Sequence, residues 1–219
     1  LIELVKNRFL DFTAIEEIKV SRKAFDAFEI DTLPLIPLLY QCGYITIKEY
    51  YPVPNNYSFT YPNEEVRRSF FESLVGSMLS ENNASANLIF EQLRDAVYEG
   101  DVTRLCSSLR NILASIPYNL QLSKEAYYHT VLHIVGMGIG RAESEVATSN
   151  GRIDLVLHAV TAVYIIELKL NKSAQEALDQ IKDRRYFEPY VGRGKAVHLI
   201  GLSFDFDTKA LTWAHEVVS

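Results

Sequence analysis

The sequence predicts an α/β fold, in which a mixed β-sheet is flanked by helices. Short runs rich in valine, isoleucine, leucine and tyrosine recur between positions 142 and 217, and they are too short to form helices. Segments of helical length with amphipathic spacing lie before and between these runs. Strands and helices in such an order pack as layers around a shared hydrophobic core, which is why we expect the α/β class.

Residues 123–219 are expected to form the α/β core. Ser123, a favourable N-cap, should begin a helix that ends near position 135, before a glycine-punctuated turn at 136–140. The later elements are expected in the order strand, strand, strand, helix, strand, strand, at positions 142–148, 151–158, 163–170, 173–186, 196–204 and 211–217. This order predicts a mixed sheet with helices on both faces.

Residues 63–122 are expected to form a helical cap on that core. Asn63 is a favourable N-cap, and two glutamates follow it in the first turn, where acidic side chains favour the helix dipole. Two further helices are expected at positions 84–98 and 101–114, with Gly100 ending the first of them. We expect these helices to pack on the core and to supply no chemistry.

Residues 1–62 are expected to form a separate small module. A helix at 33–42, a strand at 44–50 and a return strand at 57–61 follow a stretch of helix-like spacing whose limits the sequence does not define. A helix followed by a two-stranded wing predicts a winged-helix-like module. Because Lys48 is the single cation of the wing, we expect a packing or linker role rather than DNA binding.

The strands at 151–158 and 163–170 are close enough in the sequence to form a hairpin. If the hairpin is centred on the short connection between them, the numbers of paired residues sum to 321, and Asp154 lies opposite Glu167. Directly opposed residues have Cβ atoms about 4.5–5.5 Å apart on one face of a sheet. Lys169 follows two positions later, and the strand period of two places it on the same face.

Asp154, Glu167 and Lys169 in this arrangement predict a metal-dependent hydrolytic site. Two opposed carboxylates can bind one divalent cation, Mg²⁺ or Mn²⁺, through oxygen ligands. Such an ion lowers the pKa of a bound water and stabilises phosphodiester oxygens, and an ammonium group can stabilise the charge that develops in the transition state. The alternative is a hairpin whose polar residues face solvent. The otherwise apolar strands favour the functional interpretation, because buried ionised groups are costly unless they are paired or bound to metal.

The segment Ile153-Asp154 followed by Glu167-Leu168-Lys169 resembles the D…ExK motif of the PD-(D/E)XK nuclease superfamily, with Ile153 in place of the usual proline. More narrowly, the chain resembles the nuclease-like domain found C-terminal to AAA-type ATPases in bacteria. The segments that carry this resemblance lie at positions 38–47, 59, 61–67, 115–118, 148–154, 177–182 and 199–201. The resemblance implies a restriction-endonuclease-like fold, metal-dependent nuclease chemistry and an AAA-type ATPase domain in the same full-length chain.

Several other residues are candidates for the same site. In many members of the superfamily a helix before the motif supplies an additional acidic metal ligand, which here implies Glu125, although glutamate at a helix N-terminus is also common for dipole reasons. Glu145 can be a third carboxylate of the site or an exposed strand residue. Gln180 and Tyr186 resemble the Q…Y element of the exonuclease-type branch, which orients the lysine and the substrate. His129, His133 and His158 lack metal-ligand spacing, and we expect them to be structural.

The composition predicts a soluble cytoplasmic protein that does not associate with membranes. Its 219 residues are 48% hydrophobic, contain two cysteines without metal-ligand spacing, and include no apolar stretch near the roughly 20 residues needed to cross a bilayer. The chain begins with Leu1 rather than methionine, so we expect it to be part of a longer protein.

The charge of the chain leaves two functional hypotheses open. The leading one is a metal-dependent nuclease that hydrolyses phosphodiester bonds of DNA. A net charge of −6 argues against indiscriminate nucleic-acid binding and favours the alternative, a non-catalytic nucleic-acid or protein interaction domain attached to an AAA-type ATPase. Residues 182–195 are locally basic, and this segment either faces a phosphate backbone or is a solvated helix end.

Overall fold

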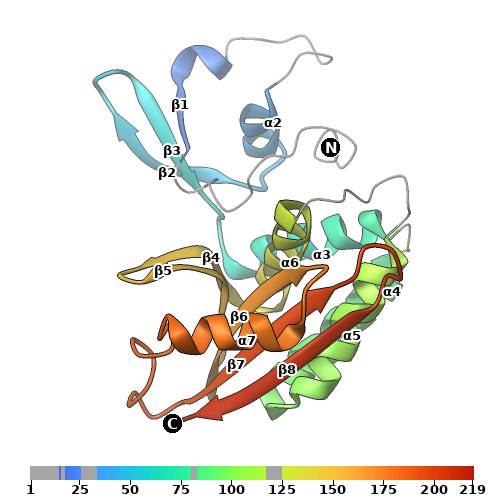
Figure 1. The fold of residues 1–219 in the computed structure, drawn as a ribbon. Helices are drawn as coiled ribbons and strands as arrows, with labels where there is room; N and C mark the ends of the chain where they lie inside the picture. The colour runs from blue at the N-terminus through green and yellow to red at the C-terminus, as the bar shows by residue number, and fades with distance from the viewer. Residues whose placement is uncertain (1–14, 16–17, 26–33, 80–82, 117–124) are drawn as a thin grey trace. The chain divides into compact units, whose positions relative to one another are not determined.

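The computed structural model describes residue 15 and residues 18–25, 34–79, 83–116 and 125–219. The chain divides into two compact units, Leu1–Phe70 and Phe71–Ser219 (Figure 1). The division falls within the helix α3 (Glu64–Met78). The predicted boundary of a separate module at residue 62 therefore stays a prediction.

The first unit contains a three-stranded antiparallel sheet and a short helix. Its elements are β1 (Lys19–Ser21), the 3₁₀ turn η2 (Arg22–Phe25), α2 (Leu35–Gln41), β2 (Thr46–Tyr51) and β3 (Asn56–Thr60), with the strands in the order β1-β3-β2. The expected helix and return strands are therefore present. The sheet has one strand more than the sequence predicts, because β1 pairs with the outer side of β3. The winged-helix-like character of this unit stays a prediction.

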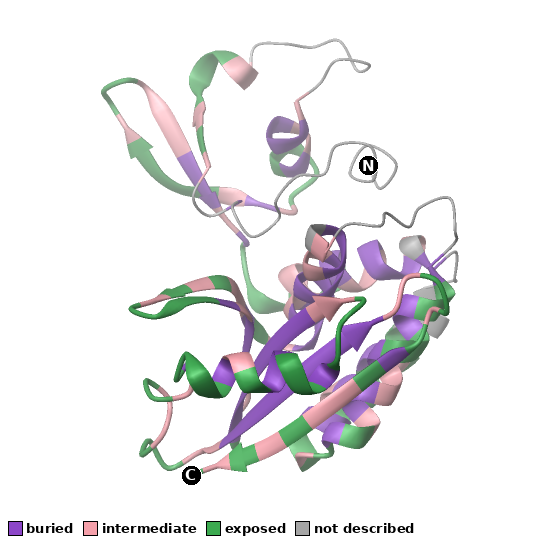
Figure 2. Cartoon of the chain, viewed as in Figure 1, coloured by how far each residue is buried: buried purple, intermediate pink, exposed green. Residues whose placement is uncertain are grey.

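The second unit is built on a five-stranded mixed sheet in the order β4-β5-β6-β7-β8. The strands are β4 (Arg141–Thr148), β5 (Gly151–His158), β6 (Ala162–Leu170), β7 (Ala196–Phe204) and β8 (Leu211–Val218). The pairing of β6 with β7 is parallel, and the other pairings are antiparallel. Figure 2 shows β6 and β7 as almost entirely buried, as central strands covered on both faces should be.

Helices cover both faces of this sheet. They are α4 (Asn83–Glu99), α5 (Val102–Ser115), α6 (Glu125–Ile139) and α7 (Ala174–Asp183). On β6, Ile165 belongs to an apolar cluster with Ile181 of α7, whereas the hydroxyl of the adjacent Tyr164 donates to the carbonyl of Val97 in α4 at 2.6 Å. Adjacent strand residues point to opposite faces, so α7 and α4 lie on opposite sides. The mixed sheet flanked by helices is consistent with the restriction-endonuclease-like fold.

The helix α6 differs from its prediction, because it continues through Gly136 and Gly138 to Ile139 instead of ending near position 135. A Cβ on Gly138 would lie 2.4 Å from the ring of Phe90, and one on Gly136 would lie 3.0 Å from the Cβ of Ala142. The two glycines therefore permit close packing on α4 and β4 and do not form a turn. The proposed cap Ser123 lies outside the described residues.

The helix α7 begins as predicted and ends earlier than predicted. Ser173 caps its N-terminus in a reciprocal arrangement with Glu176. The helix stops at Asp183, because Arg185 adopts a left-handed φ of 52° and the N–H of Tyr186 returns to the carbonyl of Ile181 at 3.0 Å. Tyr186 therefore lies beyond the helix rather than on it. Within the part of the chain that the structure describes, no helix is long and apolar enough to span a bilayer.

Candidate metal and catalytic centre

The hairpin of β5 and β6 has the predicted register. Leu155 pairs with Ile166, and the pairs Val156–Ile165, Leu157–Tyr164 and His158–Val163 follow in the same register. The ladder ends at Leu155, so Asp154 and Glu167 do not form the next cross-strand pair. Instead, Oδ2 of Asp154 accepts a hydrogen bond from the backbone N–H of Leu168 at 2.8 Å. The two strands thus separate at the residues that the motif singles out.

The neighbouring strand β4 is also irregular at this level. Glu145 lies between the paired residues Ser144 and Val146 and has a left-handed φ of 53°. A non-glycine residue in that region costs roughly 1–3 kcal/mol, and such conformations concentrate at functional sites. Oε2 of the Glu145 carboxylate lies 2.7 Å from Nη1 of Arg152. Its Oε1 lies 3.7 Å from Nδ1 of His129.

His129, Glu145 and Asp154 form a compact group of possible metal ligands. One ligand atom from each lies within 4.8 Å of the corresponding atoms of the other two, and Nε2 of His129 is 3.3 Å from Oδ2 of Asp154. Burial raises the pKa of Asp154, while His129 and the N–H of Leu168 act in the opposite direction. His129 was expected to be structural, and the structure places it among the possible metal ligands. Its position on α6, one turn after Glu125, is the one sequence signal that could have indicated it.

Glu167 is buried beside this group, with 1% of its side chain exposed. Its Oε1 accepts hydrogen bonds from Nζ of Lys169 at 2.9 Å and from Nε2 of Gln180. Its Oε2 has no hydrogen-bond partner among the described residues. Burial, together with the charge of Asp154, raises the pKa of Glu167 to about 7. A buried carboxylate oxygen without a partner is costly, and a cation bound to it would remove that cost.

Lys169 and Glu125 connect Glu167 to the histidine group. Nζ of Lys169 lies 3.9 Å from Oε1 of Glu125, which is itself 3.8 Å from Nε2 of His129. Burial by itself would lower the pKa of Lys169, but the hydrogen bond and charge of Glu167 raise it above its ordinary value. Lys169 is therefore protonated at neutral pH. The other oxygen of Glu125 accepts from the N–H of Leu170 at 3.2 Å, so this carboxylate also orients the end of β6.

The structure brings together all six residues that the sequence indicated: Glu125, Glu145, Asp154, Glu167, Lys169 and Gln180. Tyr186 does not join them. It is buried in the apolar cluster under α7, with its hydroxyl against Gly151. His158 lies at the far end of β5, 3.3 Å from Glu143.

The basic segment at 182–195 makes contacts within the protein. Lys182 pairs with Glu216 at 2.7 Å, and Nζ of Lys195 donates to the carbonyl of Ala159 at 2.7 Å. Nη1 of Arg184 donates to the carbonyl of Asn150 at 3.0 Å. These contacts favour the interpretation as a solvated and paired surface over that of a phosphate-binding segment.

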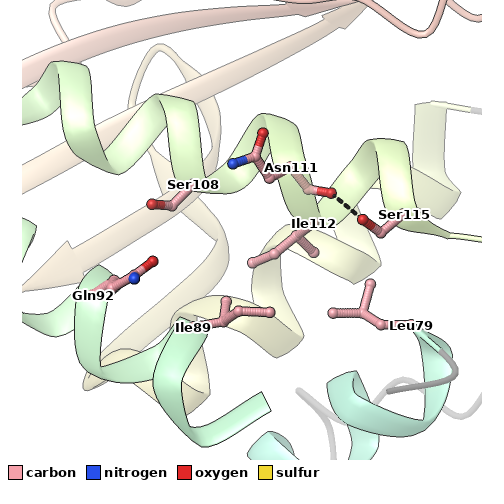
Figure 3. Close-up of a pocket in the computed structure, with 7 residues that line it drawn as sticks. All are labelled: Leu79, Ile89, Gln92, Ser108, Asn111, Ile112 and Ser115. Carbon is pink, nitrogen blue, oxygen red and sulfur yellow. Dashed lines mark hydrogen bonds between the residues drawn. The ribbon is translucent and has the colours of Figure 1, made fainter. Parts of the chain in front are cut away.

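A separate hollow lies in the helical cap between α4 and α5 (Figure 3). It is lined by apolar and uncharged polar side chains, namely Leu79, Ile89, Gln92, Ser108, Asn111, Ile112 and Ser115. None of the candidate metal or catalytic residues lines it. This hollow is therefore separate from the candidate centre at the strand ends.

The burial of Glu167 predicts a pH dependence of stability in metal-free protein. The unfolded chain should lose this proton near the ordinary value of 4.5 and the folded chain near 7, so the stabilising contribution of the protonated form is lost as pH rises through about 7. Glu167→Gln cannot ionise. We therefore expect the free energy of unfolding of the variant, relative to the wild type, to increase between about pH 5 and about pH 8.

Urea unfolding in EDTA at several pH values measures this difference. Burial lowers the pKa of His158, His198 and His215, which titrate in both proteins, so their effect cancels in the comparison. A difference between variant and wild type that stays constant across the pH range would contradict the buried position of Glu167.

Comparison with known proteins agrees with this geometry. Residues 123–214 match the family model described as PD-(D/E)XK nuclease superfamily. The chain is 31% identical over 222 residues to a protein of Azotobacter chroococcum mcd 1 named as an uncharacterized protein in the vnfD 5′ region; the match covers 96% of this chain and 43% of that protein. The chain thus spans less than half the length of this relative. No solved structure matches. By these comparisons, residues 123–214 are similar in sequence to domains of the PD-(D/E)XK nuclease superfamily.

Proposed function

We propose that this domain hydrolyses phosphodiester bonds of DNA with the help of a divalent cation, Mg²⁺ or Mn²⁺. The observation that carries the proposal is the juxtaposition of the His129–Glu145–Asp154 group with the buried Glu167–Lys169 pair. A cation, an activated water and a fixed ammonium are the parts that phosphodiester hydrolysis needs.

The residues present fit such a cation. Asp154, Glu145 and His129 offer ligand atoms close to one another, and Oε2 of Glu167 is a buried acceptor without a partner in the described structure. Carboxylates suit Mg²⁺ and Mn²⁺, and the imidazole favours the transition metal of the two. When bound, the ion would supply Lewis acidity and lower the pKa of a water.

The protein groups around this site have separate roles. The N–H of Leu168 holds Oδ2 of Asp154, and Gln180 holds Oε1 of Glu167, so both carboxylates are oriented before a ligand arrives. Lys169 keeps its proton and places a positive charge beside Glu167, where it can stabilise negative charge that develops on the phosphate. This orientation in advance avoids reorganisation during the reaction.

A plasmid-nicking assay tests the proposal. We expect conversion of supercoiled to nicked plasmid with Mn²⁺ and Mg²⁺, and none with EDTA. RNA and single-stranded DNA of matched length should be cleaved more slowly if duplex DNA is the substrate. Absence of cleavage under every metal condition, by protein shown to be folded, would refute the nuclease function.

Lys169→Ala should separate catalysis from metal binding. The variant loses a cation that stabilises the transition state, so the cleavage rate should fall by a factor on the order of 10²–10³. Metal affinity, measured by calorimetry with Mn²⁺, should be unchanged or slightly higher, because a repelling charge is gone. Lys182→Ala is the matched control, since Lys182 also pairs with a glutamate, at 2.7 Å, but lies on the exposed surface of α7. Cleavage by Lys169→Ala at the wild-type rate would remove the lysine from the mechanism.

The alternative is a non-catalytic nucleic-acid or protein interaction domain attached to an AAA-type ATPase. The net charge of −6 and the internal pairing of the basic segment favour it. The resemblance to ATPase-linked domains supports an AAA-type ATPase domain as the partner. We propose the cytoplasm as the location of the protein. Binding of DNA without cleavage in the nicking assay would favour this alternative.

A further inference from the structure

Arg152 extends the candidate centre toward the surface. It lies on β5, two residues before Asp154, and its Nη1 is 2.7 Å from Oε2 of Glu145. The other oxygen of Glu145 faces His129 at 3.7 Å. The guanidinium is thus paired with one member of the group of possible metal ligands, and 66% of its side chain is exposed.

The charges and exposures of the centre single out Arg152 as its accessible cation. Four carboxylates, those of Glu125, Glu145, Asp154 and Glu167, lie together with two cations bonded to them in the described structure, Lys169 and Arg152. A divalent ion would neutralise the remaining formal charge of −2, but a nucleic acid brings further negative charge. Lys169 is 15% exposed and bonded to Glu167, so Arg152 is the cation of this pair that a polymer can reach.

The chemistry and reach of Arg152 suit a phosphate. A guanidinium donates two parallel hydrogen bonds to a phosphate group as it does to a carboxylate, so a phosphate can take the place of Glu145. Two residues of extended strand cover about 6.6 Å, and each strand of a duplex carries one phosphate per roughly 3.4 Å of axis. Arg152 therefore lies within one or two phosphates of a backbone held at Asp154.

We propose that Arg152 binds a phosphate of the nucleic-acid backbone next to the one that is cleaved, and that Glu145 holds its guanidinium in place until nucleic acid arrives. This inference rests on the proposed function, since it assumes that nucleic acid approaches Asp154. It goes beyond it by naming a residue for substrate binding. If Arg152 instead serves only to hold Glu145, its loss should weaken metal binding and leave the electrostatics of nucleic-acid binding unaltered.

A matched control exists in the same pair of strands. Arg141 of β4 pairs with Glu143 at 2.9 Å, with side chains 77% and 40% exposed, against 66% and 46% for Arg152 and Glu145. Arg141 is opposite His158, at the other end of the β4–β5 ladder from the metal-ligand group. Replacing either arginine removes one exposed charge from one ion pair of the same kind.

The test measures affinity for a fluorescent DNA duplex as a function of salt, by anisotropy, in Ca²⁺ and again in EDTA. We expect Arg152→Ala to bind more weakly and to lose about 0.9 from the slope of log affinity against log salt, the value of one phosphate contact. Arg141→Ala should keep the wild-type slope, and Arg152→Lys should recover it. Calorimetry with Mn²⁺ should show metal affinity of Arg152→Ala equal to or above that of the wild type.

The outcomes separate this inference from the proposed function. An unchanged slope in Arg152→Ala, or an equal loss in Arg141→Ala, would overturn the role of Arg152 even if the wild type cleaves DNA. A wild type that binds DNA without cleaving it, with the expected slope change, would support Arg152 and overturn the nuclease function. A wild type that binds no DNA would overturn both.

Discussion

Asp154→Asn is expected to abolish DNA cleavage and to weaken binding of Mn²⁺ together, bringing cleavage to the level of wild-type protein in EDTA. The substitution removes the charge of a carboxylate that lies 3.3 Å from His129 and beside Glu167. The asparagine carbonyl can still accept the hydrogen bond from the N–H of Leu168, so the fold should persist. Metal binding and catalysis should therefore fail without unfolding.

Nicking assays, calorimetry and thermal unfolding measure the three quantities in this prediction. Asp179→Asn is the matched control, because the carboxylate of Asp179 also accepts a hydrogen bond, here from the side chain of Gln175 at 2.8 Å, but lies on the exposed surface of α7. Wild-type metal affinity in Asp154→Asn would contradict its role as a ligand. Loss of cleavage in both variants would point to a general effect on the domain.

Gly201→Ala is expected to destabilise the second unit by displacing α7 from the sheet. A Cβ at this position of β7 would lie 2.2 Å from the carbonyl oxygen of Ala174 and 2.4 Å from the N atom of Leu178. Both are backbone atoms of α7, so the whole helix must shift. Overpacking of this kind costs about 1–3 kcal/mol, and more where backbone has to move. Because Gln180 of α7 holds Glu167, cleavage should also decrease.

Urea unfolding and the nicking rate measure both effects. Gly140→Ala is the control, because its Cβ would meet nothing closer than the carbonyl of His158 at 3.9 Å. A Gly201→Ala variant as stable as Gly140→Ala would show that α7 does not pack directly on β7.

The local chemistry of the sequence determined the strands and helices of the core and the register of its hairpin. The short connection between β5 and β6 and their apolar residues allow one pairing that buries both strands, and the observed pairs have the predicted sum of residue numbers. Ser173 and Glu176 likewise define the start of α7 through contacts within one turn. Such features depend on residues close in sequence, and periodicity and capping reveal them.

Tertiary contacts decided what the sequence could not. The glycines of α6 were wrongly predicted to form a turn. What requires glycine at these positions is close packing against Phe90 and Ala142, which lie in other elements and cannot be identified from the local sequence. The group of His129, Glu145 and Asp154 joins α6, β4 and β5, and His129 was not among the site residues that the sequence indicated. The ladder ends at Leu155, where Asp154 turns to the N–H of Leu168. Side chains from separate elements meet only when the sheet and its helices pack, so their distances belong to the tertiary structure.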